Sequence, residues 1–296
     1  MRIEKVYFNT EDGAELVGLL HTSENKNDTD VVIHTHGMGS NCLKKRDDII
    51  AKKLTDNDIS YFTYNNRGEG IINNVRFNKE KVLQGTVFED VEDSYFDVVG
   101  AINIMKQCGY KNIHLQGHSL GSTKTLYTYN KIINDKKFDL LSSIKSIILL
   151  SLVDINYIMT MLVFENKEID IAGIASEKEH ESNLNYIIDT KTPFMPLVSA
   201  KTFLRYYRDN DNINFARYNK DEFEYKELNN VKVPLFMRWG NNKELVSIPS
   251  EKIVEILEKK LDNEIKDIGV IDGASHNYSG KEEILAEELL NFLENI

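Results

Sequence analysis

The stretch Gly117-His118-Ser119-Leu120-Gly121 decides the fold of this chain, because it places the pattern G-x-S-x-G between two different elements. An apolar run at residues 112–116 comes directly before it, and a helix-compatible run at 122–131 follows. A strand that turns sharply into a helix forces its central residue toward positive φ, and glycines two positions away on each side remove the Cβ atoms that would clash. The stretch therefore predicts a strained turn that presents the Ser119 hydroxyl at the edge of a sheet.

The elements expected on both sides of this turn alternate between strand and helix. An antiparallel hairpin is expected within residues 2–20, because two apolar runs flank a turn signal there. Further strands are expected at 31–33, 60–64, 112–116, 144–150, 233–239 and 264–271, and helices at 43–56, 86–108, 122–131, 250–261 and 281–295. Such alternation predicts a single α/β domain with a mostly parallel sheet and helices on both faces.

The alternation breaks between residues 155 and 228. This segment contains no clear buried strand, and Pro193 and Pro196 interrupt its mixed helical patterns. We expect residues 1–154 and 229–296 to form the α/β core, and residues 155–228 to be an insertion that caps the site.

The composition disfavours two classes of partner. The formal net charge of −11 disfavours a nucleic-acid backbone or an anionic membrane surface as the main partner. Residues 1–5 lack the apolar segment of a secretory signal, and no apolar run approaches the ~20 residues of a membrane span. Cys42 and Cys108 match neither a disulfide framework nor a metal spacing, and Cys42 is expected to be a packed residue rather than a nucleophile. We therefore expect a cytoplasmic protein.

A serine hydroxyl is a poor nucleophile until a base accepts its proton. In sheets of this kind the histidine follows the serine in the chain, and of the seven histidines only His180 and His276 do so. His180 lies in a charged stretch and is expected on the surface. His276 lies in a loop just after a predicted strand, so we predict it to be the general base, although a merely structural loop histidine is the alternative.

A third residue must accept a hydrogen bond from the histidine ring and fix its tautomer. The expected place is the turn after Trp239-Gly240, where Glu244 is the first carboxylate. Asp154, which ends the preceding strand, is the alternative by position, and Asp272 is a third candidate.

Acyl transfer also needs donors for the developing oxyanion. The backbone N–H of Leu120 is one candidate because it follows the nucleophile. Met38 N–H is the other, because Gly37 and Gly39 allow the turn at 36–41 to curl toward the serine. The alternative is an ordinary glycine-rich turn between a strand and a helix.

Together these residues resemble the α/β-hydrolase family. The matching pieces are the His36-Gly37 turn, the Asn66-Arg67-Gly68-Glu69-Gly70 segment, the turn at 117–121 and the His276 loop. The Asp12-Gly13 hairpin and residues 280–283 look like those of small carboxylesterases and dienelactone-hydrolase-like esterases. The resemblance covers most of the chain outside 155–228, and it implies an eight-stranded, mostly parallel sheet with a Ser–His–acid site. The chain departs from the family pattern at Lys243, where an aspartate is usual, which leaves the identity of the acid open.

Other residues admit two interpretations. A metal site formed by four histidines is conceivable, but no carboxylate or cysteine completes a ligand set, so hydrogen bonding to backbone or pocket lining is favoured. Three arginines could anchor an anionic or aromatic substrate group, but an amphipathic helix with ordinary surface arginines is favoured. Four apolar residues could line an acyl pocket or form the core of the insertion. These three sets are His34, His36, His114 and His118; Arg205, Arg208 and Arg217; and Met159, Met161, Leu162 and Phe164.

The sequence thus predicts a serine hydrolase that cleaves a small-molecule carboxylic ester through an acyl-enzyme, with no cofactor and no metal. Ser119, His276 and Glu244 are the expected catalytic residues, and Met38 and Leu120 the expected oxyanion donors. A serine at the turn argues against the carboxylate nucleophile of haloalkane dehalogenases and epoxide hydrolases. A peptidase, a thioesterase or a catalytically silent ligand-binding protein remain the alternatives.

Overall fold

The computed structural model describes residues 1–24, 29–208 and 212–296, and its centre is one large sheet. Ten strands belong to this sheet in the described part, in the order β12-β11-β8-β7-β3-β4-β2-β5-β6, with β1 beside β2. Their bounds are β1(Arg2–Asn9), β2(Ala14–Thr22), β3(Asp30–Thr35), β4(Ser60–Asn65), β5(Asn73–Phe77), β6(Glu80–Gln84), β7(Asn112–His118), β8(Ile144–Leu150), β11(Leu235–Gly240) and β12(Lys266–Ile271). The predicted mostly parallel α/β sheet is confirmed.

The number of strands differs from the prediction of eight. Six neighbouring strands of the sheet, in the order β12-β11-β8-β7-β3-β4, pair in parallel. The remaining pairings are antiparallel. The hairpin β5–β6, which turns at Asn78 and Lys79 with positive φ, adds the two extra strands. Its side chains are mostly exposed, so it carries little of the apolar alternation by which a strand is recognised in a sequence.

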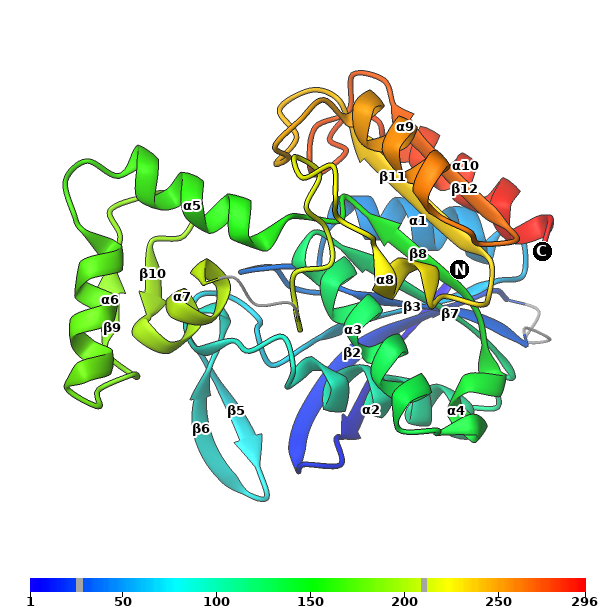
Figure 1. Ribbon diagram of the computed structural model, residues 1–296. Coiled ribbons are helices and arrows are strands. Elements are labelled where there is room, and N and C mark those ends of the chain that lie inside the picture. The colour runs from blue at the N-terminus through cyan, green and yellow to red at the C-terminus, as the bar shows by residue number, and fades with distance from the viewer. Residues whose placement is uncertain (25–28, 209–211) are drawn as a thin grey trace.

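Helices cover both faces of the sheet (Figure 1). One face carries α1(Lys45–Thr55) and α10(Glu282–Glu294), and the other carries α2(Ser94–Gln107), α3(Leu120–Asn134) and α9(Ser250–Lys260). Strand residues alternate accordingly: Val31 and Ile33 pack with the second group of helices, and Val32 packs with the first. Two shorter helices, α4(Phe138–Ser143) and α8(Lys226–Asn229), complete this group of elements.

The helix predicted over residues 86–108 is shorter than expected. A 3-10 turn, η1(Thr86–Phe88), comes first, and α2 begins only at Ser94. Glu89 between them has an extended backbone, and its carboxylate pairs with the buried Lys124. A helix through this point would turn Glu89 away from that partner, so tertiary contacts override the local pattern.

Residues 155–228 contain α5(Ile155–Glu165), α6(Ile171–His180), a small hairpin of β9(Ile187–Asp189) and β10(Leu197–Ser199), and α7(Ala200–Tyr207). In Figure 1 these elements project to the left of the sheet. They share a hydrophobic cluster to which the core contributes Val91, Leu120 and Val153. Residues 209–211 of this segment lie outside the described part.

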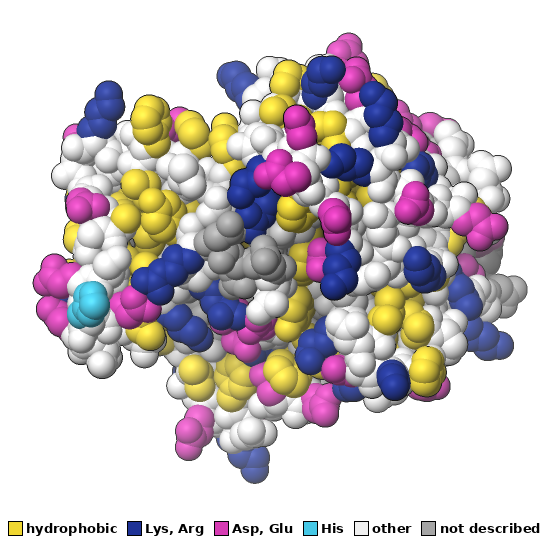
Figure 2. Space-filling model, in the orientation of Figure 1, with side chains coloured by type: hydrophobic (Ala, Val, Ile, Leu, Met, Phe, Trp, Pro, Cys, Tyr) yellow, Lys and Arg dark blue, Asp and Glu magenta, His cyan; other side chains and the backbone are white. Residues whose placement is uncertain are grey.

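The surface view shows cationic and anionic side chains interspersed, with no large area of a single sign on this face (Figure 2). Among the described residues, no helix combines the length and the apolar character that crossing a bilayer requires.

Candidate active site

Ser119 lies at the turn between β7 and α3 with φ 57° and ψ −127°. Its N–H donates a 2.8 Å hydrogen bond to Leu150 O on the neighbouring strand. A Cβ on Gly117 would lie 2.2 Å from Gly121 O, and a Cβ on Gly121 would lie 2.0 Å from Thr35 O. Both flanking glycines are therefore sterically required. The contacts around Ser119 hold its strained backbone conformation in place.

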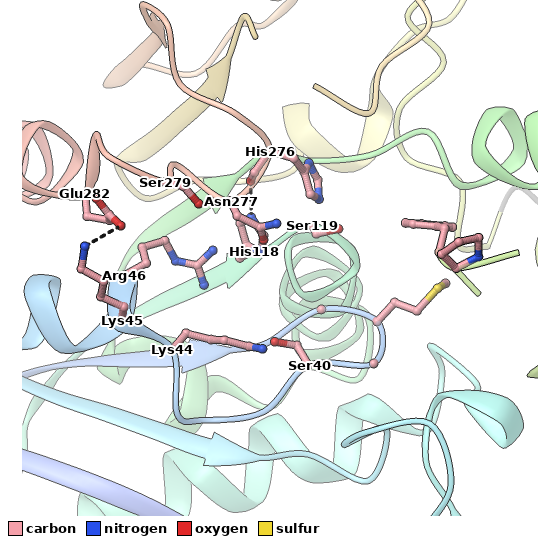
Figure 3. A pocket seen from close by; sticks show the side chains of 15 residues that line it. Ser40, Lys44, Lys45, Arg46, His118, Ser119, His276, Asn277, Ser279 and Glu282 are labelled. Atoms are coloured by element: carbon pink, nitrogen blue, oxygen red, sulfur yellow. Dashed lines mark hydrogen bonds and ion pairs between the residues drawn. The ribbon is translucent and has the colours of Figure 1, made fainter. Parts of the chain in front are cut away.

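A cavity of about 590 Å³ opens beside this turn, and Ser119 and His276 both line it (Figure 3). Both residues are half-buried. No hydrogen bond joins Ser119 Oγ to the His276 ring within the described residues. Such contacts are often long without substrate and shorten when it binds, so this geometry is compatible with a nucleophile and its base.

His276 is held by Glu244. The imidazole Nδ1 is hydrogen-bonded to Glu244 Oε1. The same carboxylate accepts 2.9 Å hydrogen bonds from Leu245 N–H and Ser151 Oγ, and a 3.1 Å hydrogen bond from Gly240 N–H. These contacts fix the carboxylate, which in turn fixes the ring. The other ring nitrogen, Nε2, has no hydrogen-bond partner among the described residues.

The carboxyl of Glu244 is ionised at neutral pH. Burial raises its pKa, but the hydrogen bond and charge of His276, together with the donors of Leu245 and Ser151, outweigh burial and bring the pKa below its ordinary value. An ionised carboxylate is the form that accepts a hydrogen bond from an imidazole N–H and stabilises an imidazolium.

The structure does not bring the other candidate acids to His276. Asp154 caps α5, where its carboxylate accepts a 3.0 Å hydrogen bond from Tyr157 N–H. Asp272 accepts a 3.1 Å hydrogen bond from the Asn241 side chain at the surface. His180, the other histidine after Ser119, is exposed at the end of α6.

Three further residues position this group. Ser151 and Tyr278 were not identified from the sequence, whereas His118 was expected to bond backbone or line the pocket and does both. Ser151, directly after β8, has φ 48° and contacts Tyr278 OH at 2.9 Å as well as Glu244. His118 Nε2–H donates a 2.7 Å hydrogen bond to His276 O, and burial holds the pKa of His118 well below its ordinary value. The position of Ser151 at the carboxyl end of a parallel strand, where ligand sites gather, is the signal that could have identified it.

The turn after β3 packs against Ser119. A Cβ on Gly37 would lie 2.8 Å from His118 O and 3.3 Å from Leu120 N, so only glycine fits this approach. Met38 follows in the turn and lines the cavity. Leu120 begins α3, so its N–H has no acceptor within the helix. Met38 N–H donates to no acceptor among the described residues, so both predicted oxyanion donors are available.

A buried ion pair stabilises the turn after β3 that carries Gly37 and Met38. Lys124 and Glu89 are each about 1% exposed and pair directly. Lys124 Nζ also lies 3.3 Å from Asn66 Oδ1, and Asn66 Nδ2 donates a 3.1 Å hydrogen bond to His36 O, one residue before Gly37. The network thus fixes the carbonyl from which the turn begins.

The other histidines considered as metal ligands, and the three arginines considered as an anchor, contact other protein groups. His36 bonds Gly37 O and Asn66 N–H, and His114 bonds Ser146 Oγ. No group of three potential metal ligands occurs in the part of the chain that the structure describes. The surface interpretation fits Arg205, which pairs with Asp90 and Glu92, and Arg208, which pairs with Glu179. Arg217 is buried and lies over the Phe223 ring, so the surface interpretation is wrong for this residue. Burial raises the pKa of the Cys42 thiol.

Two apolar hollows adjoin the cavity. A recess of only about 20 Å³ lies directly at Ser119, between Met38, Leu120, Val153, Ile155, Ile158, Met159 and Phe194. A groove of about 460 Å³ lies farther along α5 and includes Met161 and Leu162. Phe194 lines the cavity, the recess and the groove, whereas Phe164 is 75% exposed and lines none of them.

The order of the parallel strands and the strained serine turn after β7 define the α/β-hydrolase fold, in agreement with the resemblance seen in the sequence. Solved structures with this fold align over nearly the whole chain. Est1E from Butyrivibrio proteoclasticus with bound ferulic acid is 15% identical, with 98% of each chain covered and a TM-score of 0.67. The α/β hydrolase GrgF from Penicillium sp. sh18 is 17% identical, with 100% of this chain and 99% of that chain covered and a TM-score of 0.67.

A third structure, the esterase Pf2001 from Pyrococcus furiosus, is 15% identical, with 99% of this chain and 91% of that chain covered and a TM-score of 0.59. At these identities the likeness concerns the fold. No family model matches the sequence, and no curated protein matches it.

Proposed function

We propose that this protein is a serine hydrolase that cleaves a small-molecule carboxylic ester. The observation that carries the proposal is the hydrogen bond between His276 Nδ1 and the ionised Glu244, at a cavity that Ser119 also lines. The solved esterases of the same fold agree with this chemistry but do not establish it for this chain.

In the proposed reaction His276 Nε2 takes the proton of the Ser119 hydroxyl as Oγ attacks the ester carbonyl carbon. The carbonyl oxygen becomes an oxyanion and accepts hydrogen bonds from Met38 N–H and Leu120 N–H. Glu244 stabilises the imidazolium. His276 then gives the proton to the leaving alkoxide, and the alcohol departs from an acyl-enzyme on Ser119.

Water completes the cycle. His276 removes a proton from it, the hydroxide attacks the acyl carbon, and the acid leaves as Ser119 recovers its proton. All bonds are made and broken by these residues and water, so the proposal requires no cofactor or metal.

The segment 155–228 is the cap in this proposal. Pro193 and Phe194 line the cavity, and α5 contributes Ile155, Ile158 and Met159 to the recess at Ser119. The apolar part of the substrate would therefore lie between the core and this segment.

A fluorophosphonate probe and p-nitrophenyl esters test the proposal. The probe should label Ser119, and Ser119→Ala should lose labelling and about 10³-fold or more of the esterase rate. Ser40→Ala is the matched control, because Ser40 lines the same cavity but lies outside the strained turn. Hydrolysis that survives in Ser119→Ala would contradict the assignment. A folded wild-type protein that neither labels nor turns over any ester would favour a silent ligand-binding role.

A further inference from the structure

The cavity at Ser119 has a cationic side that the proposed hydrolysis does not use. Lys44, Lys45 and Arg46, at the start of α1, line it together with Glu282 (Figure 3). The apolar recess, by contrast, is lined by apolar side chains of the core and of the 155–228 segment. A substrate that fills both regions would have chemically different groups at its two ends.

Arg46 is a buried donor that faces this cavity. Its side chain is only 6% exposed. Nε donates a 2.9 Å hydrogen bond to Asp47 Oδ1, and Nη2 lies 3.3 Å from His34 Nε2. Nη1 has no acceptor among the described residues, and Figure 3 shows the guanidinium pointing into the cavity. Because two contacts hold the guanidinium in place, its free N–H groups are preorganised for a ligand.

Lys44 supplies the uncompensated charge. It is half-buried, and no carboxylate of the described residues lies within ion-pair distance of it. The other charges here are balanced, since Lys45 pairs with Glu282 at 3.5 Å and Arg46 pairs with Asp47. One net positive charge therefore remains beside the nucleophile, in a chain whose formal net charge is −11.

We infer that this side of the cavity binds a carboxylate carried by the substrate, so that the enzyme acts on anionic esters. The inference rests on the proposed function, because it specifies the substrate of the same site. A carboxylate is a monoanion that matches the single charge of Lys44, and it accepts hydrogen bonds from the free N–H groups of Arg46. A phosphate dianion would leave a negative charge unbalanced.

Two pairs of esters test the inference. The first places the charge on the acyl side, as 4-nitrophenyl hydrogen glutarate against 4-nitrophenyl valerate. The second places it on the alcohol side, as 4-acetoxybenzoate against 4-acetoxybenzamide. In one of these pairs the anionic ester should have the higher kcat/KM, by about ten-fold or more. Lys44→Gln should lower that ratio by about ten-fold, mainly through KM, and Lys44→Arg should restore it.

Lys52→Gln is the matched control, because Lys52 lies on the same helix, pairs with Asp56 and does not line the cavity. Lys52→Gln removes one positive charge without changing the cavity. Its ratio of kcat/KM for the anionic ester to kcat/KM for the neutral ester should therefore equal that of the wild type. Inhibition of 4-nitrophenyl valerate hydrolysis distinguishes a carboxylate site from a phosphate site. Glutarate should inhibit more strongly than inorganic phosphate. Stronger inhibition by phosphate would overturn the assignment to carboxylates.

The outcomes distinguish the inference from the function on which it rests. If valerate hydrolysis depends on Ser119 but the neutral ester is preferred in both pairs, the inference is wrong and the hydrolase stands. If no ester is hydrolysed, calorimetric titration of monomethyl glutarate into Ser119→Ala still tests the site. Binding that weakens about ten-fold on adding Lys44→Gln supports the inference, and no binding overturns it.

Discussion

Ser151 Oγ donates a 2.9 Å hydrogen bond to Glu244 Oε2 from the end of the strand next to the one that Glu244 follows. The carboxylate that holds His276 is therefore fixed from two strand ends at once. Glutamate is one methylene longer than the aspartate that is usual in the α/β-hydrolases this sequence resembles. It reaches the histidine ring from its own position, and both of its oxygens accept hydrogen bonds.

The identity of the acid is tested by two substitutions that each remove a charge without changing shape. Glu244→Gln should lower kcat/KM by about 10³- to 10⁴-fold, because the ring loses the partner that fixes its tautomer. Asp154→Asn should stay within about ten-fold of the wild type, since asparagine is an equally good helix N-cap. Steady-state kinetics on one p-nitrophenyl ester are sufficient, and a larger loss in Asp154→Asn would reverse the assignment.

Phe194 should set the length of the apolar group that the enzyme accepts. The recess at Ser119 is barely large enough for one water molecule, so the wild type should favour acetate and propionate esters. Phe194→Ala should join the recess to the groove of about 460 Å³ and raise the relative kcat/KM for octanoate esters.

Phe164→Ala is the control for this change, because Phe164 belongs to the same segment but is 75% exposed and lines no hollow. Its chain-length profile should match that of the wild type. An unchanged profile in Phe194→Ala would show that another residue limits the apolar group.

Removing one partner of the Lys124–Glu89 pair should lower the free energy of unfolding strongly, whereas removing both charges should lower it much less. Lys124→Met should lower the free energy of unfolding by about 3–5 kcal/mol, because it leaves Glu89 charged and buried without a partner. The double variant Lys124→Met/Glu89→Gln should recover much of that loss. Urea unfolding of these two variants and of Glu89→Gln measures the coupling, with Lys131→Met, a partly exposed lysine of the same helix, as the reference. Additive losses would show that the pair is not coupled.

The free energy of unfolding should fall as the pH falls from about 7.5 to about 5.5. Burial lowers the pKa of His21, His34, His36 and His118 in the folded protein, that of His34 to about 4. In the unfolded chain these histidines bind protons near the ordinary value of 6.5. The unfolded state therefore takes up more protons in this window, which costs the folded state up to about 1.4 kcal/mol per histidine. Urea titrations at the two pH values check the sign, and equal or greater stability at the acidic value would contradict it.

The regular part of the fold could be predicted because its signals are local. Apolar runs marked the parallel strands, and helical periodicity marked α1, α3, α9 and α10 close to their observed bounds. The hairpin β5–β6 was not predicted because its side chains face solvent, and the start of α2 was misplaced because Glu89 is held by Lys124, 35 positions away.

The candidate site was predictable to the same extent. The turn at Ser119 and the loop of His276 carry local signatures, and the structure places both at one cavity. Position alone could not choose between Glu244 and Asp154, because both follow parallel strands. Ser151 and Arg46 were not identified, since each gains its importance from partners that are distant in the sequence or from the cavity it faces.

The cavity at Ser119 is lined by two parts of the chain that pack against different neighbours. Lys44 and Arg46 lie at the start of α1, which packs against the sheet, whereas Phe194 belongs to the 155–228 segment, most of whose buried apolar residues pack in a separate cluster together with a few core residues. Selectivity for charge and selectivity for chain length can therefore evolve independently. A chimera that exchanges residues 155–228 for the corresponding part of another hydrolase should inherit the preference for anions and acquire a new preference for length.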